Sequence, residues 1–216
     1  MTKNFKIKLP EIPFDLEEGK EGGDIFTKEE LELSNCKISN SMISSKNFYP
    51  VMISKVIFKG VTFPSVSLER ADLTDVIFEN CDLSNVNLRQ GSIHRVAFKD
   101  CKLLGVDFSE SSLGNVSFEG CIARFSSFVE SRLNQVIFDQ TSLQNANYYH
   151  SKFINVEFQK SDMNEVDFHQ TVLKGIDIST CTFDRMNVSM ESLEGCVVSP
   201  EQAIGFSRLL GLKVKQ

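Results

Sequence analysis

Apolar residues recur at every fifth position of this chain, without a phase slip, from Leu33 to Leu193. A small or β-branched residue stands two places before most of them, as at Val56, Val61 and Val66, and the other positions are mostly polar. An α-helix needs a period near 3.6 residues and a simple strand a period of two, so a period of five fits neither as a continuous element. The pattern therefore predicts a chain that turns once in every repeat.

This five-residue unit resembles that of the pentapeptide-repeat family. The resemblance implies an all-β solenoid, namely a right-handed quadrilateral β-helix with four repeats, and so twenty residues, in each coil. Residues twenty apart should then stack, and two columns agree with this. Phe occupies positions 58, 78, 98, 118, 138 and 158, and Val occupies positions 56, 76, 96, 116, 136 and 156. We expect a dry, stacked core of about eight coils, each about 4.8 Å from the next.

Four of the six cysteines fall into one column of small, inward positions: Cys81, Cys101, Cys121 and Cys181. Free cysteine is among the most buried residue types, so we interpret them as packing residues of the solenoid wall. There is no CxxC pair, and no His stands at ligand spacing. We therefore predict no metal site, and a reducing compartment would keep these thiols free.

The solenoid must be capped at both ends, which predicts three segments: an N-terminal cap over residues 1–30, the repeats over 31–198, and a C-terminal helix and tail over 199–216. In the cap, alternating Phe5, Ile7 and Leu9 predict an edge strand that ends at Pro10. The tetrapeptide TKEE at 27–30 has the form of a capping box for one helical turn.

A stronger helix start lies near the C-terminus, where Ser199 can serve as N-cap, Pro200 as the first helical residue and Gln202 as the partner of the capping box. Gly211 would end this helix. The segment carries more apolar surface than one coil end needs. It is either a simple end cap or a capping helix that also forms a twofold dimer interface, which we favour. The interface residues would be Ala203, Ile204, Phe206, Leu209, Leu210, Leu212 and Val214.

Charge and composition limit the location and the partners. The formal net charge of −6 argues against direct binding of nucleic acid or of an anionic membrane. The first ten residues lack the apolar run of a signal peptide, and no later run is long enough to span a membrane. We therefore expect a cytoplasmic protein. The aromatic residues are 18 Phe, 3 Tyr and no Trp, which indicates an interior role for most of them.

Nothing in the sequence points to catalysis. His94, His150 and His169 do not share a column, and no nucleophile elbow, phosphate-binding loop, dinucleotide fingerprint or HExxH helix is present. We predict no catalytic residue, no cofactor and no enzyme activity. Function should then lie on the outer, polar positions. One outer ladder, at 59, 79, 99 and 119, alternates in sign, as expected for surface stabilisation. Another face is net acidic and is open to solvation or docking: it carries Asp107, Glu110, Glu130 and Asp167.

One repeat departs from the pattern. Its central residue is Ala123, while Ile122 and Phe125 take positions that should be polar, with Arg124 between them. Two interpretations remain open. Phe125 either folds back to fill the space above Ala123, or it is exposed as a contact site together with Leu104 of the preceding coil. In the second case these residues and the acidic face would form the partner-binding surface.

The ending VVSPEQA at 197–203, followed by LLGL at 209–212, resembles that of the Qnr-type quinolone-resistance proteins. This resemblance implies a homodimeric, DNA-mimicking rod that binds DNA gyrase and topoisomerase IV, inhibits their DNA binding and protects them against quinolones. The unbroken register resembles the loopless Gram-positive type, either the enterococcal type or the mycobacterial MfpA type. The alternative function is a generic cytoplasmic interaction scaffold with another partner.

Overall fold

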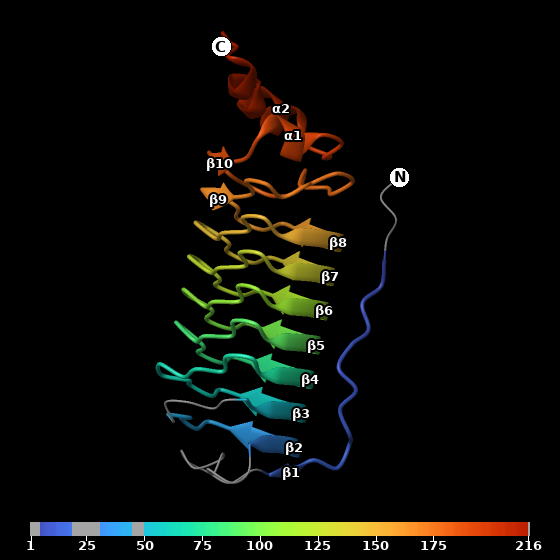
Figure 1. Cartoon of the computed structure of the whole chain (residues 1–216), viewed down its shortest axis with the longest axis vertical. Helices are drawn as coiled ribbons and strands as arrows, with labels where there is room; N and C mark the ends of the chain where they lie inside the picture. Colours follow the sequence, from blue (N-terminus) through green and yellow to red (C-terminus); the bar gives the residue numbers. More distant parts are fainter. Residues whose placement is uncertain (1–4, 19–30, 45–49, 216) are drawn as a thin grey trace.

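The computed structural model describes residues 5–18, 31–44 and 50–215, and these form a rod of stacked coils with a short helical segment at one end (Figure 1). The coils pair through one parallel sheet of eight strands in chain order. These strands are β1 (Glu17–Glu18), β2 (Glu32–Ser39), β3 (Met52–Lys59), β4 (Asp72–Glu79), β5 (Ser92–Lys99), β6 (Ser112–Glu119), β7 (Arg132–Asp139) and β8 (Lys152–Gln159). A second pair joins β9 (Val166–Asp167) to β10 (Met186–Asn187).

The strand register confirms the twenty-residue coil. Val56 pairs with Val76 and Phe58 with Phe78, and the same offset runs through the sheet to β8. Isolated parallel bridges at the same offset, such as Thr62 with Asp82, join the other sides of the coils. The predicted β-solenoid is therefore confirmed. Each coil has four short sides and turns at every fifth residue.

Two ladders of aromatic rings fill the rod. Rings in the column that contains Phe98 and Phe118 stack with centroids 4.7–5.0 Å apart. A second column, from Phe108 to Phe168, includes Tyr148 and stacks at 4.7–5.1 Å. The two columns meet edge to face, as between Phe118 and Phe128, whose ring centroids lie 6.1 Å apart. These spacings match the distance between neighbouring strands, so coil stacking and ring stacking reinforce each other.

Cysteine and serine side chains at the small inward positions form hydrogen bonds to the preceding coil. The thiols of Cys81, Cys101 and Cys121 each donate to a carbonyl of the preceding coil at 3.4 Å. The hydroxyl of Ser111 donates to Leu88 O at 2.7 Å in the same manner. The prediction that these cysteines are buried wall residues is confirmed. Hydrogen bonding to the neighbouring thiol of Cys121, together with burial, raises the pKa of the Cys101 thiol to about 12.

The coil turns through a left-handed residue at nearly every fifth position. The glycines at these corners, such as Gly60 and Gly120, have φ of 63° and 64° as expected. Polar residues adopt the same conformation at most other corners, with φ between 47° and 59°. Asn and Asp tolerate this region best, whereas bulky side chains are strained there.

The repeat pattern continues to Leu193, but its last unit is helical. Ser189 caps α1 (Met190–Leu193) by accepting from Ser192 N, so the local cap replaces the expected turn. Beyond it, α2 (Pro200–Phe206) begins with the predicted capping box between Ser199 and Gln202. A 3₁₀ turn, η1 (Ser207–Leu210), continues to Gly211, whose φ of 70° ends the helical segment as predicted.

The N-terminal segment differs from the expected cap strand. Residues 5–16, the N-terminal strap, form no strand and run beside the rod across the edges of the coils (Figure 1). A chain that runs across the strands cannot join their ladder, because their backbone groups already pair from coil to coil. The chain pairs with the sheet directly after the strap, at β1, which pairs with β2 at Cys36 and Lys37. The proposed capping box at 27–30 lies outside the described residues.

Candidate interaction surfaces

The irregular repeat forms an apolar patch on the outside of the rod. Leu104, Ile122 and Phe125 are 41%, 45% and 61% exposed, respectively. The interpretation that Phe125 folds back over Ala123 is therefore wrong. Phe125 occupies a left-handed corner with φ of 58°, and Ala123 is fully buried. We call Leu104, Ile122 and Phe125 the apolar patch.

Phe125 is unusual at such a corner. The same column holds Asn85, Gly105, Asn145 and Glu165 in neighbouring coils, and Phe125 is the bulkiest of the set. A non-glycine residue in the left-handed region costs about 1–2 kcal/mol unless its side chain is well suited to it. The chain therefore bears local strain to display an aromatic ring. Next to Phe125, Arg124 is held to the next coil by a 3.0 Å hydrogen bond from its Nε to Ser142 Oγ.

The four acidic residues predicted as a surface lie on one side of the coils. Three of them also have local structural contacts. Asp107 Oδ1 accepts from Ser109 N at 2.9 Å, and Asp167 Oδ1 accepts from His169 N at 2.8 Å. Glu110 accepts from Gln90 Nε2 at 2.7 Å and also pairs with Arg89.

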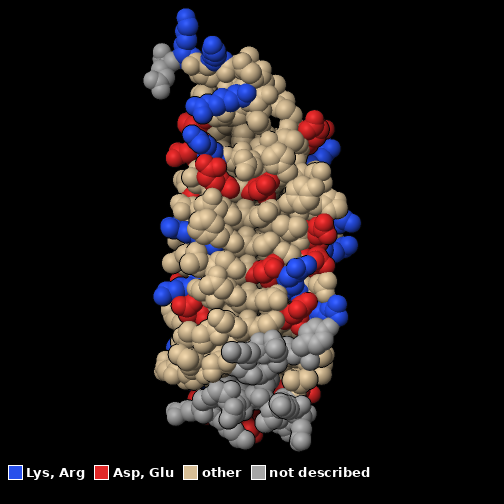
Figure 2. Space-filling model, turned by 60° about the vertical axis from the view of Figure 1, so that its left-hand side comes forward, with Lys and Arg blue, Asp and Glu red and all other residues tan. Residues whose placement is uncertain are grey.

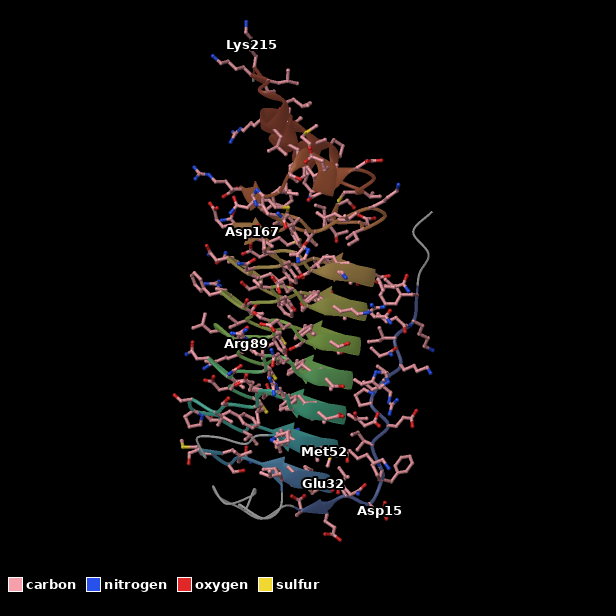
Figure 3. The ribbon with its side chains drawn as sticks, in the orientation of Figure 1. Asp15, Glu32, Met52, Arg89, Asp167 and Lys215 are labelled. Carbon is pink, nitrogen blue, oxygen red and sulfur yellow. The ribbon has the colours of Figure 1, made fainter. Side chains whose placement is uncertain are left out.

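The contacts of Glu110 also affect its titration. Hydrogen bonds, first from Gln90 and then from Arg89, lower the pKa of the Glu110 carboxyl. On the face shown in Figure 2, acidic and basic residues lie next to one another in small mixed groups between uncharged stretches, without a continuous acidic stripe. Figure 3 shows Arg89 and Asp167 toward the side of the rod away from the strap.

The remaining polar residues considered in the sequence form local pairs. In the alternating ladder, Lys59 and Glu79 form an ion pair at 2.8 Å. His169 contacts Asp167, with 3.0 Å between Nδ1 and Oδ1. Within the described residues, no three His, Cys, Asp or Glu side chains are grouped closely enough to hold a metal ion. No helix in that part of the chain is long and apolar enough to cross a membrane.

The C-terminal helical segment leaves most of its apolar side chains uncovered. Ile204, Leu209, Leu210, Leu212 and Val214 are all exposed. Ala203 and Leu210 line an apolar groove of about 450 Å³, together with residues of the last coil such as Leu193. Phe206 is instead half-buried, with its ring 5.4 Å from that of Phe183. In the groove wall, burial and then the charge of Asp177 raise the pKa of Cys196 to about 11.

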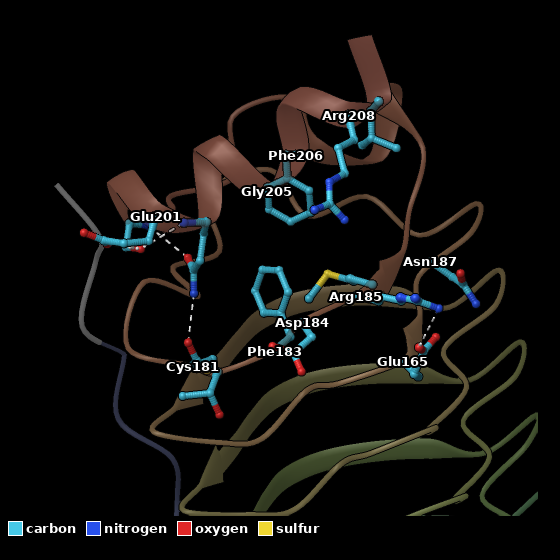
Figure 4. A pocket seen from close by; sticks show the side chains of 15 residues that line it. Glu165, Cys181, Phe183, Asp184, Arg185, Asn187, Glu201, Gly205, Phe206 and Arg208 are labelled. Atoms are coloured by element: carbon cyan, nitrogen blue, oxygen red, sulfur yellow. Dashed lines mark hydrogen bonds and ion pairs between the residues drawn. The ribbon is translucent and has the colours of Figure 1, made fainter. Parts of the chain in front are cut away.

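A second hollow of about 600 Å³ lies on the other side of Phe206, between α2 and the last coils (Figure 4). Gln202 closes one side by donating from Nε2 to Ile178 O and Cys181 O, both at 2.9 Å. Arg185 and Arg208 extend toward this hollow, and Arg185 lies 3.9 Å from Glu165. The bridging glutamine holds the helix on the end of the solenoid, so the exposed apolar residues are presented on a fixed element.

Sequence reasoning missed the surface beneath the strap. Lys8 N donates to Asn115 Oδ1 at 2.9 Å, and Glu11 N donates to Asp75 Oδ1 at 2.8 Å. Gln135 Nε2 donates to Lys6 O at 3.4 Å. Asp75, Arg95, Asn115 and Gln135 form one column of corner residues, which we call the strap corner. In the sequence, these four residues are recognisable only as polar residues at corner positions. A corner that faces water also carries polar residues, so the sequence does not show that these four contact another segment.

Comparison with known proteins agrees with this architecture. The family model for the pentapeptide repeat region matches residues 71–138 and 91–168. No curated protein matches the chain.

Among solved structures, QnrB1, a plasmid-mediated fluoroquinolone-resistance protein, is 21% identical in one of its forms, with a TM-score of 0.50. That match covers 83% of this chain and 92% of QnrB1. HetL, from the cyanobacterium Nostoc sp. strain PCC 7120, is 16% identical with a TM-score of 0.41, over 77% of this chain and 82% of HetL. The family model and the coil register together identify residues 71–168 of this chain as a pentapeptide repeat region.

Proposed function

We propose that this protein is a rod-shaped, homodimeric inhibitor of DNA binding that engages DNA gyrase and topoisomerase IV and protects them against quinolones. The observation that carries the proposal is the C-terminal segment. Its Qnr-like sequence forms a capped helix whose apolar residues stay exposed on a fixed element. An apolar surface of this kind is suited to self-association about a twofold axis. Two rods joined there would make one long, slender particle, with its topoisomerase-binding surfaces outside the seam.

We further propose that the apolar patch is the centre of the topoisomerase-binding surface, with Arg124 and the acidic residues around it. Interface hot spots are enriched in aromatic residues and Arg, and Phe125 and Arg124 stand side by side on the outer corner. Glu130 donates from its backbone N to Tyr149 O, but its carboxylate has no hydrogen-bond or ion-pair partner among the described residues, so its charge is available to a partner. Asp107, Glu110 and Asp167 belong to the rim of this surface.

A second candidate is a generic interaction scaffold with another partner, and the charge distribution favours it. DNA mimicry calls for a continuous negative surface, whereas several acidic residues here pair with bases of neighbouring coils, as Glu79 does with Lys59. An uncharged outer face is compatible with many protein partners. Both candidates place the protein in the cytoplasm and require no catalysis.

Gyrase supercoiling assays with the purified protein test the first candidate. We expect inhibition at micromolar protein without drug, and recovery of supercoiling at lower protein in the presence of a fluoroquinolone. Phe125→Asn should weaken both effects about tenfold or more, as expected for a hot-spot residue. Glu157→Gln, on a different side of the coil, serves as the control. Absence of inhibition and of rescue across this range would contradict the gyrase proposal and leave the scaffold.

Self-association is tested separately by solution mass. We expect a dimer for the wild-type protein and a monomer for the double variant Ile204→Lys and Leu210→Lys, because two buried charges would oppose closure of an apolar seam. A wild-type protein that stays monomeric at all accessible concentrations would contradict the proposed dimer.

A further inference from the structure

The strap follows the strap corner along the axis of the rod. Lys8 and Glu11 are three residues apart, and their partners Asn115 and Asp75 are two coils apart. Three extended residues and two coil spacings each amount to about 10 Å, so an extended chain keeps register with the corner. The contact is therefore a repeating match between an extended backbone and a ladder of coils.

The rod recognises the strap through its backbone. Asn115, Asp75 and Gln135 bond to main-chain groups of the strap, and these are groups that every extended segment presents. Asp75 is in turn held by Arg95, which donates from Nε and Nη2 to the two carboxylate oxygens at 2.6 Å each. The acceptors are thus preorganised and do not depend on the side chains of the strap.

Small residues occupy outward positions beside this corner. At outward positions of β5 and β6, Ala97 and Ser117 take the place of the isoleucines found in β4 and β7, and both are 2% exposed. The Ser117 hydroxyl is buried without a hydrogen-bond partner among the described residues. One polar group beside the strap corner is therefore left unsatisfied while the strap is in place.

The side chains of the strap contribute little that is specific. Leu9 is 64% exposed and Phe14 is fully exposed, whereas Phe5, Ile7 and Ile12 are only half-buried. The strap is tethered to the rod through β1. A tethered segment competes at an effective concentration in the millimolar range, so weak contacts are enough to keep it in place.

We propose that the strap corner is a binding site for extended peptide segments and that residues 5–16 are its built-in, displaceable occupant. The ligand is an extended segment of a partner protein with free backbone N–H groups in the Lys8 and Glu11 registers. A polar side chain that reaches Ser117 would give it an advantage over the strap. The site lies apart from the apolar patch and does not depend on the topoisomerase proposal.

The test uses the full-length chain with its strap released. Lys8→Pro together with Glu11→Pro removes both N–H donors and leaves every residue of the rod unchanged. Trypsin cleavage after Lys6 should become at least tenfold faster. A fluorescein-labelled peptide with the sequence of residues 5–16 should then bind this variant saturably by anisotropy, at least tenfold more tightly than it binds the wild-type chain. Adding Asn115→Ala to the variant should weaken peptide binding about fivefold, as expected for one hydrogen bond.

Matched peptides separate backbone recognition from simple apolar attraction. N-methylation at Lys8 and Glu11 should abolish binding. N-methylation at Leu9, whose amide has no hydrogen bond to the described residues, should preserve most of it. Equal binding of the two methylated peptides, or equal binding of the peptide to released and wild-type chains, would overturn the proposal.

Two further measurements keep the proposal open to refutation. If the two-proline chain fails to fold, the wild-type chain labelled at its N-terminal amine replaces it. Millimolar unlabelled peptide should then lower the anisotropy of that label, and an unchanged signal counts against displacement. If the strap of one copy instead occupied the strap corner of another copy, releasing it would separate the two copies. The two-proline chain would then have a lower solution mass than the wild type. Such a fall would overturn occupancy within one chain, whereas identical masses support it.

Discussion

Two corners of the same coil share a backbone and differ in what they do with it. At both, the turning residue is left-handed, with φ of 57° at Asn115 and 58° at Phe125. At the strap corner, polar side chains are buried and hold an extended segment. At the Phe125 corner, the residues one coil before and one coil after, Gly105 and Asn145, are uncharged, and an aromatic ring is exposed to solvent. The solenoid thus sets the geometry of its corners, and the single residue at each corner decides whether it binds its own chain or is open to a partner.

The largest expected contrast between the corners comes from removing an acidic residue at each. Asp75→Ala would leave Arg95, which is only 21% exposed, without its partner and would release the strap. We expect a loss of about 3 kcal/mol in the free energy of unfolding, as for other broken buried pairs. Glu165→Ala, at the Phe125 corner, is the matched control, and its exposed pair with Arg185 should contribute below about 1 kcal/mol. Urea unfolding measures both, and equal losses would contradict the contrast.

In the interior of the coils, a substitution is expected to raise the stability of the protein instead of lowering it. The Tyr148 hydroxyl is fully buried in the ring ladder without a hydrogen-bond partner among the described residues. Tyr148→Phe should therefore stabilise the protein by about 1–2 kcal/mol, because an unsatisfied buried group is removed without changing the stacking. The midpoint of urea unfolding should rise. A decrease would show that the hydroxyl has a partner in solution.

A smaller effect is expected at the Phe125 corner itself. Phe125→Asn places at this corner the residue that Asn145 supplies one coil later. We expect a gain of about 1 kcal/mol in stability, because Asn is better suited to the left-handed region and little burial is lost. The same variant should lose partner binding. A variant that is more stable but binds the partner more weakly would identify this corner as a partner-binding site. A loss of stability would indicate that Phe125 has a packing role.

The smallest effect concerns pH at the strap corner. Burial opposes ionisation of Asp75, but hydrogen bonds from Arg95 and from Glu11 N outweigh it and lower the pKa of the carboxyl. A lowered pKa in the folded state means that the stabilisation is present above the ordinary pKa of Asp and is lost as the pH falls through the lower value. Trypsin cleavage after Lys6 can be followed with controls for enzyme activity down to pH 5, and it should show no strap release between pH 8 and pH 5. Release within that range would contradict the assignment of Asp75 as the anchor.

The sequence alone determined the solenoid, because stacking forces a strict repetition. Each coil must place an apolar and a small side chain over those of the last, and so the columns of Val56 and Phe58 are visible without coordinates. The C-terminal helix was equally readable, since Ser199, Pro200 and Gln202 form a cap from local contacts alone. Features of this kind depend on residues that are near in sequence or related by the fixed period.

Only the tertiary structure decided the rest. The direction of the Phe125 ring depends on a corner torsion and on packing around Ala123, which a periodic pattern leaves open. The course of the strap depends on Lys8 meeting Asn115, a contact between residues 107 positions apart that follows no repeat. Polar corner residues read the same in sequence whether they face water or hold a chain, so the strap corner became visible only when the coils were stacked and the first residues were laid against them.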